Sequence, residues 1–207
     1  IYYAGNSGAE ANEGAMKLSY QYHQANGKNN KKWFISRYQS FHGSSSETVA
    51  IGDKFNLRFF KNFNPKFRAK VKEHNLYRYK NINESEKDYS NRSIDEIEKK
   101  IRKIGPENIS GFVAETMMGG LVGDVPACDG YWKKLRSICN KYDIHLICDE
   151  IWCGAGTSGK LYCVDHENIT PDFITFGKTL TSGYLPLSII ITRSKFLKKI
   201  KKKFNLI

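Results

Sequence analysis

Short apolar runs alternate with amphipathic helical segments along most of this chain, and this alternation limits its possible folds more than any other feature. The runs are rich in branched and aromatic residues, and the clearest lie at residues 33–38, 109–115, 144–148 and 171–178. Strands that alternate with helices are typical of an α/β fold with a mostly parallel sheet flanked by helices. We predict that fold, with ligands bound at the carboxyl ends of the strands.

Apolar spacings of three and four residues predict the helices between these strands. One helical face lies within residues 11–22, and another runs from Ile94 to Ile104, where Gly105 and Pro106 end it. Ser93 and Glu96 match an S-x-x-E capping box, which predicts that this second helix starts there. Residues 53–91 have weak periodicity, and we expect long loops over them.

The composition limits the possible partners of the chain. It has 207 residues, with 33 Lys and Arg against 21 Asp and Glu, giving a net charge of +12. The basic residues are spread along the chain rather than gathered in one patch, so we expect no nucleic-acid partner. No apolar run approaches the roughly 20 residues of a membrane span, and no signal peptide is visible, so we expect no membrane association.

The cysteines indicate a reducing setting. Their number is five, none forms a CxxC pair, and their spacing to histidines matches no standard zinc pattern. We therefore expect a cytoplasmic protein without a metal site.

Three features suited to ligand binding or catalysis lie next to the predicted strands. The turn at Gly5–Ala11 leads into a helix, whose free N–H groups and dipole attract a phosphate. Asp149 follows the apolar run "HLIC", and Lys178 ends the run "FITFGK". Each has an ordinary explanation alone: a tight turn, an exposed acid and a solvated lysine. Together they supply what pyridoxal 5'-phosphate requires, namely an anion site, an acid for its ring nitrogen and a lysine for a Schiff base.

The motifs at these positions resemble a known family. The stretches "NSGAEANEGAMKLSY", "FHG" and "PDFITFGKTLTSGYLP", with the segment Glu115 to Gly159, resemble the class III pyridoxal-phosphate-dependent aminotransferases of fold type I. The resemblance covers nearly all of residues 1–193 except the region around 53–91. It implies the large domain of that fold, a three-layer α/β/α arrangement.

The resemblance also implies the roles of eight residues. Those matching the family's cofactor-binding positions are Ser7, Gly8, Ala9, Phe41, His42, Asp149, Ile151 and Lys178. Gly8 and Ala9 match the phosphate-binding backbone, with Ser7 beside them. Phe41 and Ile151 match residues on the two faces of the pyridine ring. Asp149 matches the acid facing the ring nitrogen, and Lys178 the Schiff-base lysine that also moves a proton. His42 fits a turn-holding role better than that of a base, and the role of Glu115 stays open.

The implied activity is the transfer of an amino group from an amine or amino acid to a keto acid or aldehyde. An aminomutase of the glutamate-1-semialdehyde type resembles the same motifs and stays open, as does a non-enzymatic basic fragment that binds nucleic acid or membrane. The chain departs from the family where Thr157 replaces an arginine and Gly120 a second glutamate, and Ala9 replaces a serine. Because relatives acting on ornithine or γ-aminobutyrate commonly carry that second glutamate, Gly120 disfavours these two substrates.

The ends of the chain predict a fragment. It begins at Ile1 without Met, and members of the family are about twice as long, so we expect residues 1–193 to be part of the large domain, without the small domain. The basic segment 194–207 has apolar residues at helical spacing, and we expect them to pack on the missing domain rather than on a membrane surface. The resemblance implies a homodimer, whose partner chain supplies a threonine to the phosphate site, and weak cofactor binding by the fragment alone.

Overall fold

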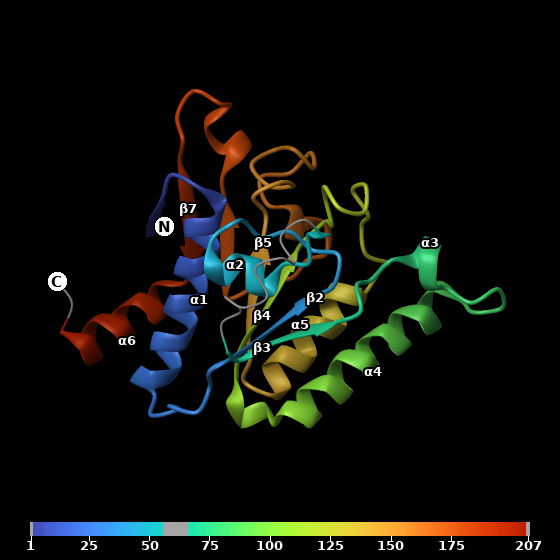
Figure 1. The fold of residues 1–207 in the computed structure, drawn as a ribbon, viewed down its shortest axis with the longest axis horizontal. Helices are drawn as coiled ribbons and strands as arrows, with labels where there is room; N and C mark the ends of the chain where they lie inside the picture. The colour runs from blue at the N-terminus through green and yellow to red at the C-terminus, as the bar shows by residue number, and fades with distance from the viewer. Residues whose placement is uncertain (1, 56–65, 206–207) are drawn as a thin grey trace.

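The computed structural model describes residues 2–55 and 66–205, which form one seven-stranded sheet (Figure 1). In spatial order, its strands are β1 (Tyr2–Gly5), β7 (Ser188–Thr192), β6 (Phe173–Phe176), β5 (His145–Asp149), β4 (Ile109–Glu115), β2 (Trp33–Arg37) and β3 (Arg68–Val71). Only β7 runs against the others, since it pairs antiparallel with β1 and β6 while the remaining neighbours pair parallel. The predicted α/β fold with a mostly parallel sheet is confirmed.

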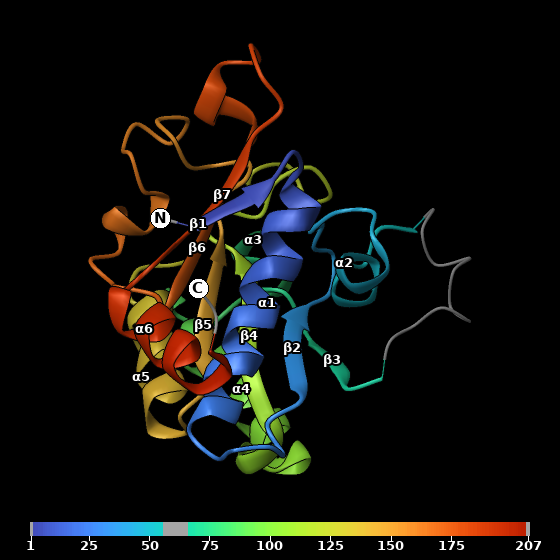
Figure 2. The ribbon, with the colours of Figure 1, turned by 90° about the vertical axis from the view of Figure 1, so that its left-hand side faces the viewer.

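Helices cover both faces of the sheet and make three layers. The helices α1 (Gly8–Ala25) and α6 (Ser194–Phe204) lie on one face, and α4 (Glu86–Ile104) and α5 (Tyr131–Lys141) on the other (Figures 1 and 2). Ile147 of β5 belongs to the core under α1, while its neighbours Leu146 and Cys148 belong to the core under α4 and α5. Successive side chains of a strand point to opposite faces, so a continuous apolar run supplies both cores.

Short elements complete the description. These are the helices α2 (Ser46–Ile51) and α3 (Leu76–Tyr79), and the 3₁₀ turns at Pro106–Asn108, Cys163–His166 and Lys178–Thr181. Within the described part of the chain, no helix is both long and apolar enough to cross a membrane.

The predicted start of the second long helix is wrong. Helix α4 begins at Glu86, and Ser85 caps it by accepting a hydrogen bond from the Asp88 N–H at 3.1 Å. Ser93 lies inside the helix, where it is buried and hydrogen-bonded to His74 Nδ1 at 3.1 Å. The first two turns are polar apart from Tyr89, so apolar spacing carries no signal there.

The predicted loops over residues 53–91 are also partly wrong. This region contains β3, α3 and the first turn of α4, while residues 56–65 lie outside the described part of the chain. Strand β3 is at the sheet edge and only Val71 is buried in it, so it lacks the apolar run of a central strand.

The basic C-terminal segment packs on this chain itself. Phe196 and Ile200 of α6 are buried against α1, and the Phe196 ring lies 4.5 Å from Tyr22 and 5.0 Å from Phe173, centroid to centroid. The expectation that this apolar face packs on a missing domain is therefore wrong. The lysines of α6 stay on its solvent side, as is usual for a surface helix.

Candidate functional site

All eight residues singled out from the sequence line one cavity, of about 770 Å³, at the carboxyl ends of β4, β5 and β6. Asp149 is the last residue of β5, Lys178 follows β6, and Ser7 to Ala9 begin α1. Parallel strands end at the same edge of a sheet, which is why residues 170 positions apart in the sequence meet here. The volume is within the usual range of small-molecule sites.

The start of α1 forms the predicted anion site. Ser7 is its N-cap, and its Oγ accepts a hydrogen bond from the Glu10 N–H at 3.3 Å. Glu10 Oε2 accepts in return from the N–H groups of Ser7, at 2.8 Å, and Asn6, at 2.7 Å, and the Asn6 bond is the main cause that lowers the pKa of Glu10. Gly8 and Ala9 keep the N–H groups that a helix start leaves for a ligand.

Gly8 is required by the close approach of a neighbouring loop. A Cβ at Gly8 would lie 2.9 Å from Cγ2 of Ile151, which follows β5. Gly43 (φ +136°) is similarly close, because a Cβ there would lie 2.6 Å from the Cβ of Ala9. The start of α1 thus packs between two loops. One carries Ile151, and the other carries Phe41 and His42.

The carboxylate of Asp149 is buried in the cavity wall and held by several hydrogen bonds. It is 4% exposed, and its Oδ2 accepts a hydrogen bond from Asn12 Nδ2 at 2.7 Å. Its Oδ1 accepts from the Ile151 N–H at 3.0 Å. Asn12 is itself fixed, since its Oδ1 accepts from Thr175 Oγ1 at 2.8 Å and its Nδ2 also donates to the His42 carbonyl at 2.9 Å. The carboxylate therefore has one orientation.

His42 contacts this carboxylate directly. Its Nδ1 lies 2.7 Å from Asp149 Oδ2, and because a carboxylate only accepts, Nδ1 carries the proton. Its Nε2 is buried and has no hydrogen-bond partner among the residues that the structure describes. The His42 carbonyl accepts a hydrogen bond from Asn12, while its imidazole contacts Asp149, so the side chain supports the carboxylate.

Two glutamates next to the site have different roles. Glu115 ends β4, pairs in register with Asp149 and lines the cavity, and its Oε1 accepts from the Phe41 N–H at 3.3 Å. Burial raises the pKa of Glu115 to about 7. Glu150 points away and accepts from Thr116 Oγ1 at 3.0 Å and from the N–H groups of Cys163 and Val164 at 2.7 and 2.8 Å. It holds the following loop in place.

Lys178 reaches the cavity from the end of β6. It begins a 3₁₀ turn with φ +40°, an unusual conformation for a residue with a side chain. It is exposed, and its Nζ lies 5.8 Å from the centre of the Trp152 ring. Trp152 in turn donates from Nε1 to Asp124 Oδ1 at 2.7 Å.

Sequence reasoning missed Asn12 and Trp152 as site residues. Asn12 lies beside Ala11 and Ala15 on the buried face of α1. A polar amide on this apolar face was the sequence feature that indicated a site residue. Trp152 follows Ile151 immediately, but nothing in the sequence shows that its ring turns toward Lys178. Among the described residues, no group of three or more potential metal ligands occurs.

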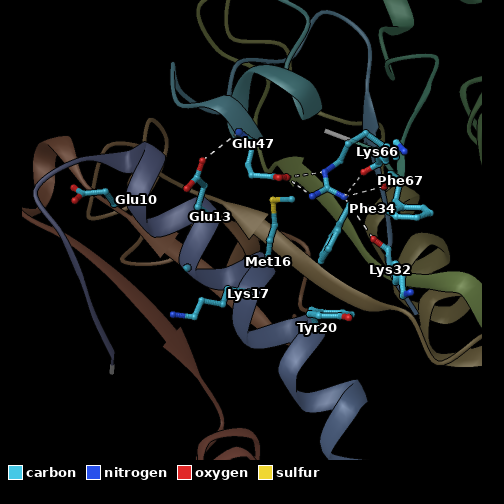
Figure 3. A pocket seen from close by; sticks show the side chains of 12 residues that line it. Glu10, Glu13, Met16, Lys17, Tyr20, Lys32, Phe34, Glu47, Lys66 and Phe67 are labelled. Carbon is cyan, nitrogen blue, oxygen red and sulfur yellow. Dashed lines mark hydrogen bonds and ion pairs between the residues drawn. The ribbon is translucent and has the colours of Figure 1, made fainter. Parts of the chain in front are cut away.

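A second hollow, of about 800 Å³, lies on the outer side of α1 (Figure 3). Its lining mixes both charge signs, and Glu47 and Arg68 form an ion pair across it. The Glu13 carboxylate also accepts from the Glu47 N–H at 3.2 Å. None of the eight predicted site residues lines this hollow, so we assign the chemistry to the cavity at the strand ends.

Comparisons with known proteins agree with the site. Gamma aminobutyrate transaminase 2 of Solanum lycopersicum is 34% identical over 97% of this chain and 43% of that protein. Vanillin aminotransferase of Capsicum chinense is 32% identical over 97% of this chain and 43% of its own length.

Solved structures agree as well. The omega transaminase of Pseudomonas jessenii in complex with PMP superposes with a TM-score of 0.91 at 32% identity, covering 97% of this chain and 44% of that chain. A PLP-bound aminotransferase mutant from Vibrio fluvialis gives 0.91 at 29% identity, covering 99% and 44%. The chain thus spans less than half the length of these relatives. The profile of the family described as "Aminotransferase class-III" matches residues 2–203, and the chain belongs to this family of pyridoxal-phosphate-dependent enzymes.

Proposed function

We propose that this chain is the cofactor-binding part of a transaminase, which moves an amino group from an amine or amino acid to a keto acid or aldehyde. One observation carries the proposal. A buried, fully hydrogen-bonded acid, an exposed lysine and a helix start with free N–H groups line a single cavity. Family membership supports the same reaction class.

The residues present fit pyridoxal 5'-phosphate. The backbone of Gly8 and Ala9 at the start of α1 would hold the phosphate, and Asp149 the ring nitrogen. Ile151 and Phe41 would contact the two faces of the ring. Gly8 supports this assignment independently, because any Cβ there would displace Ile151. When bound, the cofactor supplies an electron sink for negative charge at the substrate carbon.

Asp149 would act by charge. Its three hydrogen-bond donors hold the carboxylate in place, so it can face a protonated ring nitrogen without reorganising. Two opposite charges 4 Å apart interact with about 4 kcal/mol at an effective dielectric constant near 20. That is about a thousandfold in binding of the protonated ring.

Lys178 would bind the cofactor covalently and move a proton. Its side chain is exposed to the cavity and lies against the Trp152 ring, so its amine can reach a substrate. Once free, this amine would carry a proton from the substrate carbon to the bound cofactor, acting first as a base and then as an acid. Trp152 and Leu185, both partly exposed, also line the cavity.

The proposal extends to the wider protein. We infer that residues 1–193 are part of the large domain, that a small domain completes the substrate site, and that two copies form a homodimer. Family membership supports these inferences. The small-molecule partners are an amino donor and a keto acid or aldehyde. Relatives named for γ-aminobutyrate and for vanillin match this chain about equally, so we propose no narrower substrate. The free thiols support a reducing, cytoplasmic setting.

The half-reaction with an amino donor tests the proposal. The purified full-length protein, with the inferred small domain, is loaded with cofactor and mixed with a panel of amines and amino acids. The absorbance change from the aldehyde to the amine form of the cofactor is followed. We expect conversion with at least one donor and none by Lys178→Ala. Conversion by Lys178→Ala at the wild-type rate, or no conversion with any donor by a protein that has bound the cofactor, would refute it.

A further inference from the structure

Two buried cysteines lie together at the base of the loop that follows Asp149. Cys153 is 0% exposed and Cys163 7%, and their thiols are hydrogen-bonded to each other. The other three cysteines are single buried thiols, and one of them, Cys128, is 3.2 Å from His74 Nε2. Nothing in the proposed transaminase reaction uses the Cys153–Cys163 pair.

Backbone hydrogen bonds bring the two arms of the loop together next to these residues. The Ala155 N–H donates to the Leu161 carbonyl at 2.9 Å, and the Gly156 N–H to the Lys160 carbonyl at 3.2 Å. These two bonds close the loop on itself, and Cys153 and Cys163 lie two residues beyond the Ala155–Leu161 bond on its two arms.

Contacts on both sides hold the pair in this position. The Glu150 carboxylate accepts from the Cys163 N–H at 2.7 Å, which anchors the far end of the loop to the residue after Asp149. On the near side, the Gly154 N–H donates to the Glu150 carbonyl at 2.9 Å. Backbone groups at or next to both cysteines are therefore anchored to the same residue, Glu150.

We propose that Cys153 and Cys163 are a redox-active dithiol, which a low-molecular-weight disulfide converts to an intramolecular disulfide across the base of this loop. Ile151 and Trp152 directly precede Cys153 and line the cavity, so the bond fixes the loop that forms one wall of the site. The inference about the thiols does not depend on the proposed reaction.

The order of the chemical steps follows from exposure and hydrogen bonding. The hydrogen bond from Cys153 stabilises a Cys163 thiolate and lowers the pKa of Cys163, which is also the more exposed thiol. The Cys163 thiolate attacks one sulfur of the oxidant and releases one thiol. Cys153 then attacks the mixed disulfide at Cys163 and releases the second thiol. The two protein protons leave with the two released thiols, so the protein is oxidised by two electrons and the oxidant is reduced.

Peptide mapping after exposure to oxidised glutathione tests the proposal. Trypsin cleaves between the two cysteines at the exposed Lys160, so the disulfide joins the peptides 142–160 and 161–178. We expect this linked pair, two hydrogens lighter than the separate peptides together, from folded protein. Peptide 142–160 also contains Cys148, and fragmentation of the linked pair within this peptide assigns the bond to Cys153.

Variants separate the steps. Cys153→Ser should stop at a glutathione adduct on Cys163, Cys163→Ser should give neither adduct nor linked pair, and the control Cys128→Ser should behave as wild type. Hydrogen exchange over residues 151–162 should slow in the oxidised protein.

The proposal is overturned if folded wild-type protein keeps both thiols free or retains only the mixed adduct. A linkage through Cys148 would overturn it equally, and fragmentation of wild-type peptides detects it even if a variant does not fold.

Discussion

Replacing Asp149 with asparagine separates the charge of this residue from its shape. In the variant, Oδ1 can still accept from the Ile151 N–H, but an amide NH₂ takes the place of Oδ2, which now faces Asn12 and His42. His42 can adapt by moving its proton to Nε2, so that Nδ1 accepts. Asn12 cannot, because its Oδ1 is bonded to Thr175 and its Nδ2 to the His42 carbonyl. One buried donor therefore faces another donor.

The magnitude follows from that single mismatch. A hydrogen bond to a charged group contributes about 1.5–3 kcal/mol, so we expect Asp149→Asn to lower the free energy of unfolding by about 2 kcal/mol without cofactor. The loss of charge adds a separate effect on the cofactor, an interaction of about 4 kcal/mol, or about a thousandfold in affinity for the protonated ring. Asp149→Ala leaves three buried donors without an acceptor and should cost more stability than Asp149→Asn.

Urea unfolding and cofactor titration measure the two effects on the same samples. Asp95→Asn is the matched control, because it makes the same chemical change on the exposed side of α4 and should alter stability by less than about 0.5 kcal/mol. If Asp149→Asn unfolds at the wild-type urea midpoint and binds the cofactor with wild-type affinity, then Asp149 neither anchors this network nor faces the ring nitrogen.

Three further predictions concern the cap, the buried histidines and the helix start. Ser85→Ala should lower the free energy of unfolding by about 1 kcal/mol, whereas Ser85→Asp, which keeps an acceptor, should stay near wild type in the same urea assay. Burial lowers the pKa of His23 to about 4 and that of His145 to about 3, so below pH 6.5 the unfolded chain binds protons that the folded chain excludes. Stability should fall from about pH 6.5 to pH 4, by about 3 kcal/mol for His23 alone, and urea midpoints that stay constant over this range would contradict the assignment. Gly8→Val should displace Ile151 and weaken cofactor binding at least tenfold, and unchanged affinity in a titration would show that the two do not pack as described.

Much of the site was predictable because its key residues follow apolar runs. Asp149 and Lys178 come at or just after strands, and parallel strands bring such positions to one edge. The turn before α1 was also predictable, since Ser7 and the small residues beside it are local signals. The exact position of Lys178 was not, because β6 ends two residues earlier and Lys178 starts a 3₁₀ turn.

The contacts between distant residues were not predictable in the same way. Asn12 and His42 meet Asp149 across 137 and 107 positions, and no pattern within either segment specifies that pairing. The polar start of α4 and the edge strand β3 were missed for another reason. Neither buries enough apolar surface to produce a periodic signal, and the contacts with neighbouring elements decide their structure.

Reduction of the cofactor-loaded protein with borohydride tests the central claim most directly, because it converts a Schiff base with the cofactor into a stable covalent bond. Trypsin does not cleave after a modified lysine, so a tag on Lys178 should appear on a single peptide spanning residues 161–193. We predict that this peptide carries the pyridoxyl phosphate group and that Lys178→Ala carries none. A tag on another lysine, with residues 161–178 recovered unmodified from protein that has bound the cofactor, would contradict the account.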